Sequence, residues 1–213
     1  MEKIYFDNTT FIWKTKLNLS NSKSIFLKES ENIINANPNI KTDGYGFVSE
    51  WNNNLDFTGK LNIRIELDKI VQMGVDNCKT IYDEKQLPYN KINTEAWVNV
   101  VRSKNPVQTN FYENEEKYHV HTDINKKMKS FVPNYTYVYY IQMPDKMVGE
   151  DGVLYIMSKS GKEYFIIPEE DDLIIMEGDL PHAPNTAPNS TIDRIVLAGN
   201  IGFDFIKKEK SLI

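Results

Sequence analysis

The second half of the chain is a succession of short β-rich segments separated by turn signals. Between residues 95 and 205, runs rich in Val, Ile, Tyr and Phe alternate with clusters of Gly, Pro, Asp and Asn. Turn signals spaced by about eight to twelve residues are typical of a β-sandwich or barrel, with jelly rolls among the options. We therefore predict a mainly β fold with a double-stranded β-helix (jelly roll or cupin-like) core.

The predicted strands follow from β-branched and aromatic runs bounded by turn residues. They are Glu95–Arg102, Tyr118–Asp123, Tyr135–Gln142, Gly152–Met157, Glu163–Ile167, Leu173–Met176, Arg194–Asn200 and Phe203–Phe205.

The first half of the chain contains the helical patterns. Apolar residues in Asn62–Glu84 recur at three- and four-residue steps, which predicts a helix packed across one face of a sheet. Ser22–Ala36 predicts a shorter helix, and residues 1–20 predict one or two short strands. Because no linker, repeat or low-complexity tract interrupts the chain, we expect one domain over residues 1–213. Residues 1–93 would form a helical, N-terminal support, and residues 94–206 the β core.

Composition narrows the choice of partner and compartment. The 213 residues have a net charge of -5, which argues against non-specific binding of nucleic acids. Cys78 is the only cysteine, so there is no internal disulfide, as expected in a reducing compartment. No signal peptide opens the chain, and no segment reaches the roughly 18 apolar residues that a membrane helix needs. We expect a cytoplasmic protein with no membrane partner.

The three histidines of the chain lie in only two places. His119 and His121 precede Asp123, and His182 follows a Gly-Asp-Leu-Pro turn. In a strand, His121 and Asp123 would face the same way, and a jelly roll could return His182 beside them. Two imidazoles and a carboxylate with open coordination positions are the ligand set of a non-haem Fe(II) oxygenase.

Five segments of the chain, in order, resemble the 2-oxoglutarate/Fe(II)-dependent dioxygenases, especially the prolyl 4-hydroxylase-like branch. The resemblance spans roughly residues 97–205. It rests on His121-Thr122-Asp123, Tyr137–Ile141, Gly149–Tyr155, Ile167–His182 and Arg194–Asn200, which look like the family's His-x-Asp pair, tyrosine strand, Gly-Gly-x-Leu segment, distal-His turn and Arg-bearing strand.

The resemblance implies an enzyme and assigns its site residues. His121, Asp123 and His182 would bind Fe(2+), and Arg194 would bind the C5 carboxylate of 2-oxoglutarate, for which its planar guanidinium is suited. By resemblance Tyr139 assists Arg194, and Tyr137 and Tyr135, which would point to the same face of the strand, are its close rivals. The implied reaction uses O2, with ascorbate as an optional reductant. It releases succinate and CO2 and hydroxylates a C–H bond.

The resemblance also suggests a substrate. A prolyl residue of a peptide or protein is the leading candidate, and a small molecule is the alternative. Two other classes of protein fit the residues. His119, His121 and His182 could form a three-His site of a cupin-type metalloenzyme, with Asp123 outside the metal shell. Alternatively, the chain is a non-catalytic jelly-roll binding module whose histidines are structural. Asn99 and Gln142 are further candidates for the pocket wall.

Overall fold

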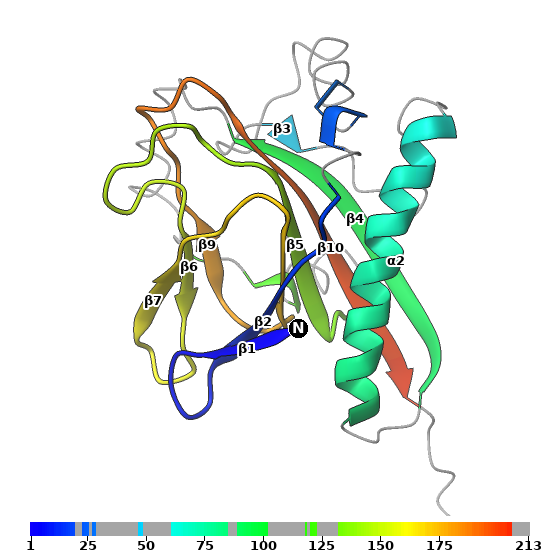
Figure 1. Cartoon of the computed structure of the whole chain (residues 1–213). Helices are drawn as coiled ribbons and strands as arrows, with labels where there is room; N and C mark the ends of the chain where they lie inside the picture. Colours follow the sequence, from blue (N-terminus) through cyan, green and yellow to red (C-terminus); the bar gives the residue numbers. More distant parts are fainter. Residues whose placement is uncertain are drawn as a thin grey trace, which may run out of the picture.

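The computed structural model describes residues 1–19, 23–25, 27–28, 47–48, 61–84, 89–101, 118, 120–122 and 132–205. Two antiparallel sheets face each other, and one long helix covers the outer side of the larger sheet (Figure 1). This arrangement confirms the predicted jelly-roll core with a flanking helix. None of the described helices is long and apolar enough to span a membrane.

The larger sheet has seven strands in the order β1-β2-β8-β5-β10-β4-β3. Their bounds are β1 Glu2–Tyr5, β2 Phe11–Lys16, β3 Phe47–Val48, β4 Tyr89–Val101, β5 Tyr135–Gln142, β8 Asp172–Glu177 and β10 Arg194–Phe205. β1 and β2 confirm the one or two short strands predicted over residues 1–20, and they join the larger sheet.

The smaller sheet has three strands in the order β7-β6-β9. They are β6 Leu154–Met157, β7 Glu163–Ile166 and β9 His182–Pro184. An apolar layer fills the space between the two sheets, with Ile156 of β6, Ile174 of β8 and Val138 of β5 among its members. This layer forms the wall around the candidate site.

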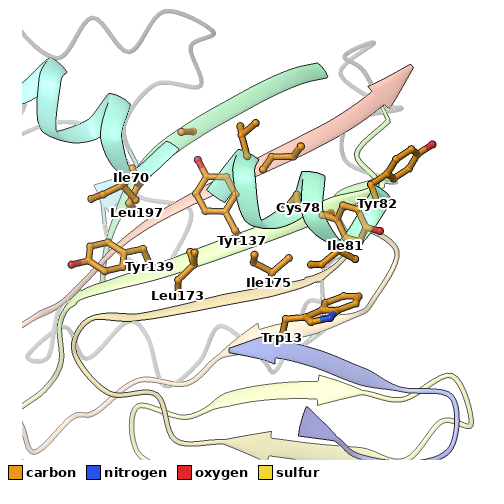
Figure 2. Close-up of a cluster of buried hydrophobic side chains, with 14 of the residues drawn as sticks. Trp13, Ile70, Cys78, Ile81, Tyr82, Tyr137, Tyr139, Leu173, Ile175 and Leu197 are labelled. Carbon is orange, nitrogen blue, oxygen red and sulfur yellow. The ribbon is translucent and has the colours of Figure 1, made fainter. Parts of the chain in front are cut away.

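Helix α2, Leu61–Glu84, packs on the opposite face of the larger sheet. Its buried side chains include Ile70, Cys78 and Ile81, which fall on one face because they are spaced by three or four residues or multiples of them. They meet the aromatic side chains of β5, as Figure 2 shows for Tyr137. The larger sheet is therefore apolar on both faces.

Several predicted boundaries agree with the structure and others do not. The helix over Asn62–Glu84 and the strand over Tyr135–Gln142 are confirmed. The first core strand begins at Tyr89, six residues before Glu95, because it pairs along its length with β10. The two predicted final strands are one continuous strand, β10. Of Ser22–Ala36, residues 23–25 and 27–28 are helical, and the rest lies outside the described residues.

Candidate active site

A pocket opens to solvent between the two sheets. Half of its lining side chains are aliphatic and the other half carry polar groups, and small-molecule sites combine the same two kinds of side chain. Its lining consists of Asn99, His121, Val138, Tyr140, Leu154, His182, Pro184, Arg194, Val196 and Ala198.

The strand register explains which side chains of the larger sheet face this pocket. Val196 of β10 pairs with Tyr140 of β5 on one side and with Asn99 of β4 on the other. The three side chains therefore form one row across the inner face. Arg194 lies two residues along β10 and points to the same face, because successive strand residues alternate. A guanidinium, a phenol and a carboxamide thus line the side of the pocket that the larger sheet forms.

His182 is the first residue of β9, where it pairs with Ile156 of β6. Its ring is buried, and burial lowers the pKa of the imidazole to about 4. Nδ1 lies 2.9 Å from the carbonyl oxygen of Leu180, so Nδ1 carries the hydrogen and donates it. In this tautomer the lone pair of the neutral ring lies on Nε2, the atom through which the imidazole would bind a metal ion.

His121 lies against His182, although 61 positions separate the two residues. The ring centroids are 5.0 Å apart, and the planes are 8° from parallel. The next residue, Thr122, donates its backbone N–H to the carbonyl of Gly178 at 3.1 Å, which ties this segment to the turn before β9. Two buried imidazoles at one wall fit the nitrogen part of a transition-metal site.

The local backbone at His121 differs from the prediction. His121 and Thr122 have helical geometry, whereas the sequence predicts an extended strand over Tyr118–Asp123. The alternation used to place Asp123 beside His121 therefore does not apply. Asp123 itself lies outside the described residues, as does His119, and within the described part of the chain no three His, Cys, Asp or Glu side chains cluster. The roles of His121, His182 and Asp123 as metal ligands stay predictions.

Arg194 is buried in the wall of the pocket, with 3% of its surface exposed. Its Nη1 donates to the backbone carbonyl of Asn185 at 3.0 Å. Tyr140 is its aromatic neighbour in the pocket wall. Burial raises the pKa of Tyr140, while the positive charge of Arg194 acts in the opposite direction. The phenol therefore keeps its proton and can donate a hydrogen bond beside the guanidinium.

Tyr139 and Tyr137 are not in the pocket, which corrects the expectation that they bind the cosubstrate. Both lie on the outer face of β5, in the core cluster with α2 (Figure 2). The Tyr139 hydroxyl donates to Oδ1 of Asp171 at 2.6 Å, and Tyr137 has no exposed surface. The pocket-facing tyrosine is Tyr140, one position away and on the opposite face of the strand.

Of the two further candidates for the pocket wall, Asn99 and Gln142, only the first lines the pocket. Asn99 lines the pocket, and its Oδ1 is buried with no hydrogen-bond partner among the residues that the structure describes. Gln142 instead donates from Nε2 to the carbonyl of Asp193 at 2.8 Å, which supports the loop before Arg194. Sequence reasoning gave no role to Tyr140 or Asn185. Tyr140 lies within the tyrosine segment Tyr137–Ile141 that carries the resemblance, whereas no motif marks Asn185.

No protein-family model matches the sequence, and no curated protein matches it. Solved structures do match. The chain resembles a prolyl-4-hydroxylase from Pseudomonas putida with a TM-score of 0.54 and 14% identity, over 93% of this chain and 94% of that one. A Trichoplax adhaerens prolyl hydroxylase, in complex with a hypoxia inducible factor oxygen degradation domain peptide fragment, matches with a TM-score of 0.53 and 13% identity, over 91% and 83%.

A putative 2OG-Fe(II) oxygenase family protein from Caulobacter crescentus matches with a TM-score of 0.53 and 10% identity, over 91% of this chain and 77% of that one. The fold is therefore that of the 2OG-Fe(II) oxygenases. Within that class, the neighbours include prolyl hydroxylases that are covered over most of their length. At these identities the likeness concerns the fold, so the chemistry has to be argued from the pocket.

Proposed function

We propose that this protein is an Fe(II)- and 2-oxoglutarate-dependent dioxygenase that hydroxylates a C–H bond. The observation that carries the proposal is the pocket itself, which is lined by the stacked pair His121 and His182 and by Arg194 of the larger sheet. A 2-oxo diacid needs a metal-binding end for its keto-acid group and a cation for its distal carboxylate. The pocket offers both at once.

The metal site would consist of His121, His182 and Asp123. His182 supplies a neutral imidazole that its hydrogen bond to Leu180 holds in one orientation. Such outer hydrogen bonds orient a ligand ring and raise its affinity for metal. When bound, Fe(II), 2-oxoglutarate and O2 would supply the oxidising chemistry, with succinate and CO2 as by-products and ascorbate as an optional reductant.

The far end of the cosubstrate would be held by Arg194 and Tyr140. A guanidinium forms paired, charge-assisted hydrogen bonds with a carboxylate, and a protonated phenol adds one more donor. The aliphatic part of the lining, including Leu154 and Val196, would exclude water and so strengthen these contacts. The contribution of the chain is thus to bind, orient and shield the cosubstrate.

For the substrate, we propose a prolyl residue of a peptide or protein. The structural neighbours from Pseudomonas putida and Trichoplax adhaerens are prolyl hydroxylases, and the second was solved in complex with a peptide fragment. A small-molecule substrate would use the same pocket chemistry and stays the alternative.

The reaction class is tested by incubating the purified protein in air with Fe(II), ascorbate and 2-oxoglutarate and measuring succinate. Many enzymes of this kind turn over slowly without substrate, so Pro-containing peptides are added and searched by mass spectrometry for a gain of one oxygen atom. We expect metal-dependent succinate from the wild type and none from Arg194→Met. Absence of 2-oxoglutarate binding in the presence of Fe(II) would contradict the proposal.

A further inference from the structure

The short strand β9 joins the two ends of the candidate site. It begins at His182 and ends at Pro184, and both residues line the pocket. The next residue, Asn185, accepts a hydrogen bond from Nη1 of Arg194 at its backbone carbonyl, at 3.0 Å. Four consecutive residues, 182–185, therefore connect the His182 imidazole of the pocket lining to the carbonyl that the Arg194 guanidinium contacts.

The backbone and side chain of Asn185 are tied to their surroundings by several further hydrogen bonds. Its backbone N–H donates to the carbonyl of Val153 at 2.8 Å, and its Nδ2 donates to the carbonyl of Glu150 at 2.7 Å. Its Oδ1 accepts from the backbone N–H of Thr186 at 2.9 Å. These bonds fix the position of the carbonyl that Arg194 contacts.

The turn that receives Asn185 is itself held in place. The backbone N–H of Gly152 donates to the carbonyl of Thr186 at 3.0 Å, and the hydroxyl of Tyr155 donates to the carboxylate of Glu150. Nδ2 of Asn185 also lies 3.4 Å from the Tyr155 hydroxyl. We call Asn185, Glu150 and Tyr155 the Asn185 clamp. None of the three residues lines the pocket, so the clamp reaches it only through Arg194 and Pro184.

We propose that Asn185 is a positioning residue for Arg194, and that β9 and the Asn185 clamp set the separation between the metal-binding and carboxylate-binding ends of the site. The inference rests on the proposed function. A long guanidinium side chain has many rotamers, and one firm acceptor restricts the plane in which its fork meets a carboxylate. Because a bidentate contact depends on that plane, a loosened clamp weakens recognition of the distal carboxylate and leaves the keto-acid end unchanged.

Two matched ligands distinguish binding at the carboxylate end of the site from binding at the metal end. 2-Oxoglutarate and 2-oxopentanoate share a five-carbon 2-oxo acid chain, and only the first has a carboxylate at C5. Their dissociation constants are measured by calorimetry with Mn(II) in the absence of O2, for the wild type and for Asn185→Ala. The ratio of the two constants reports the recognition of the C5 carboxylate alone.

We expect Asn185→Ala to raise the dissociation constant of 2-oxoglutarate by about tenfold, the effect of about one hydrogen bond. The dissociation constant of 2-oxopentanoate should change little. Tyr155→Phe, which weakens the same clamp without truncating a backbone-anchored turn, should change the ratio in the same direction by less. In an Arg194→Met background, Asn185→Ala should have no further effect on the ratio, because the two residues act as one unit.

Thr10→Val is the control, since Thr10 is buried, its Oγ1 accepts from the backbone N–H of Lys159, and neither residue lines the pocket. It should lower stability and leave both constants unchanged. Equal weakening of the two acids by Asn185→Ala, or additivity with Arg194→Met, would overturn the positioning role. A wild-type protein that does not prefer 2-oxoglutarate over 2-oxopentanoate would instead refute the proposed function.

Discussion

The ring of Tyr137 lies directly over Gly199 of the neighbouring strand. A Cβ atom at position 199 would overlap Cζ and the hydroxyl of Tyr137. On the helix side of the same ring, the position of a Cβ on Gly74 would be 3.5 Å from it, an ordinary contact. The ring is thus enclosed between β10 and α2, and it has no exposed surface.

This enclosure predicts opposite effects for two alanine substitutions. Gly199→Ala should lower the free energy of unfolding by about 1–3 kcal/mol, because either the buried ring or the backbone must move. Gly74→Ala should be neutral or stabilising by up to about 1 kcal/mol, since alanine is the better helix former and there is room for the methyl group. Urea unfolding of the two variants checks both signs, and a Gly199→Ala protein as stable as the wild type would contradict the packing.

Two adjacent tyrosines should behave differently because they face opposite sides of β5. Tyr140→Phe removes the phenolic hydroxyl beside Arg194. It should weaken the binding of 2-oxoglutarate by about tenfold, as expected for the loss of a hydrogen bond to a carboxylate. Tyr139→Phe removes the bond to Asp171 and should cost about 1–2 kcal/mol of stability without changing the dissociation constant. Calorimetry and chemical unfolding of both variants provide the comparison. The reverse pattern would restore Tyr139 as the cosubstrate residue.

The metal ligands are tested by binding alone, without turnover. Asp123→Ala and His182→Ala should each weaken the binding of Mn(II) or Co(II) by more than about a hundredfold, since a group that binds the metal directly is lost. His119→Ala is the matched control and should retain metal affinity within a fewfold. If instead His119→Ala abolishes binding and Asp123→Ala does not, the site is the three-His type.

The hydrogen bonds of Asp145 to the loop before Arg194 predict a contribution to stability that depends on pH. Its carboxylate accepts from Oγ of Ser190 at 2.6 Å and from the backbone N–H of Thr191 at 2.7 Å, and these bonds lower its pKa from the usual 3.8. A carboxyl group with a lowered pKa in the folded state stabilises the fold above its ordinary pKa, and this stabilisation is lost as the pH falls through the folded-state pKa.

Asp145→Asn should therefore lower Tm at pH 7, and the difference from the wild type should shrink as the pH falls below about 4. Circular dichroism melts between pH 7 and pH 3 provide the measurement. A difference in Tm that stays constant over this range would show that the charge of Asp145 is not responsible.

The sequence by itself determined the elements whose pattern repeats locally. The helix over Asn62–Glu84 was readable from its three- and four-residue apolar steps, and β5 from its β-rich run between turn signals. The sequence also indicated that residues near His121 and His182 belong together, through a resemblance of segments in order. These features depend on periodicity and on turn chemistry, which are properties of neighbouring residues.

Only the tertiary structure decided which face of β5 carries the site. Tyr137 and Tyr139 point to α2, while Val138 and Tyr140 point to the pocket. Alternation reveals the buried face of a strand only when the other face is polar, and here a helix covers one face and a second sheet the other. The contact between Arg194 and Asn185 was equally hidden, because the acceptor is a backbone carbonyl, which every residue has.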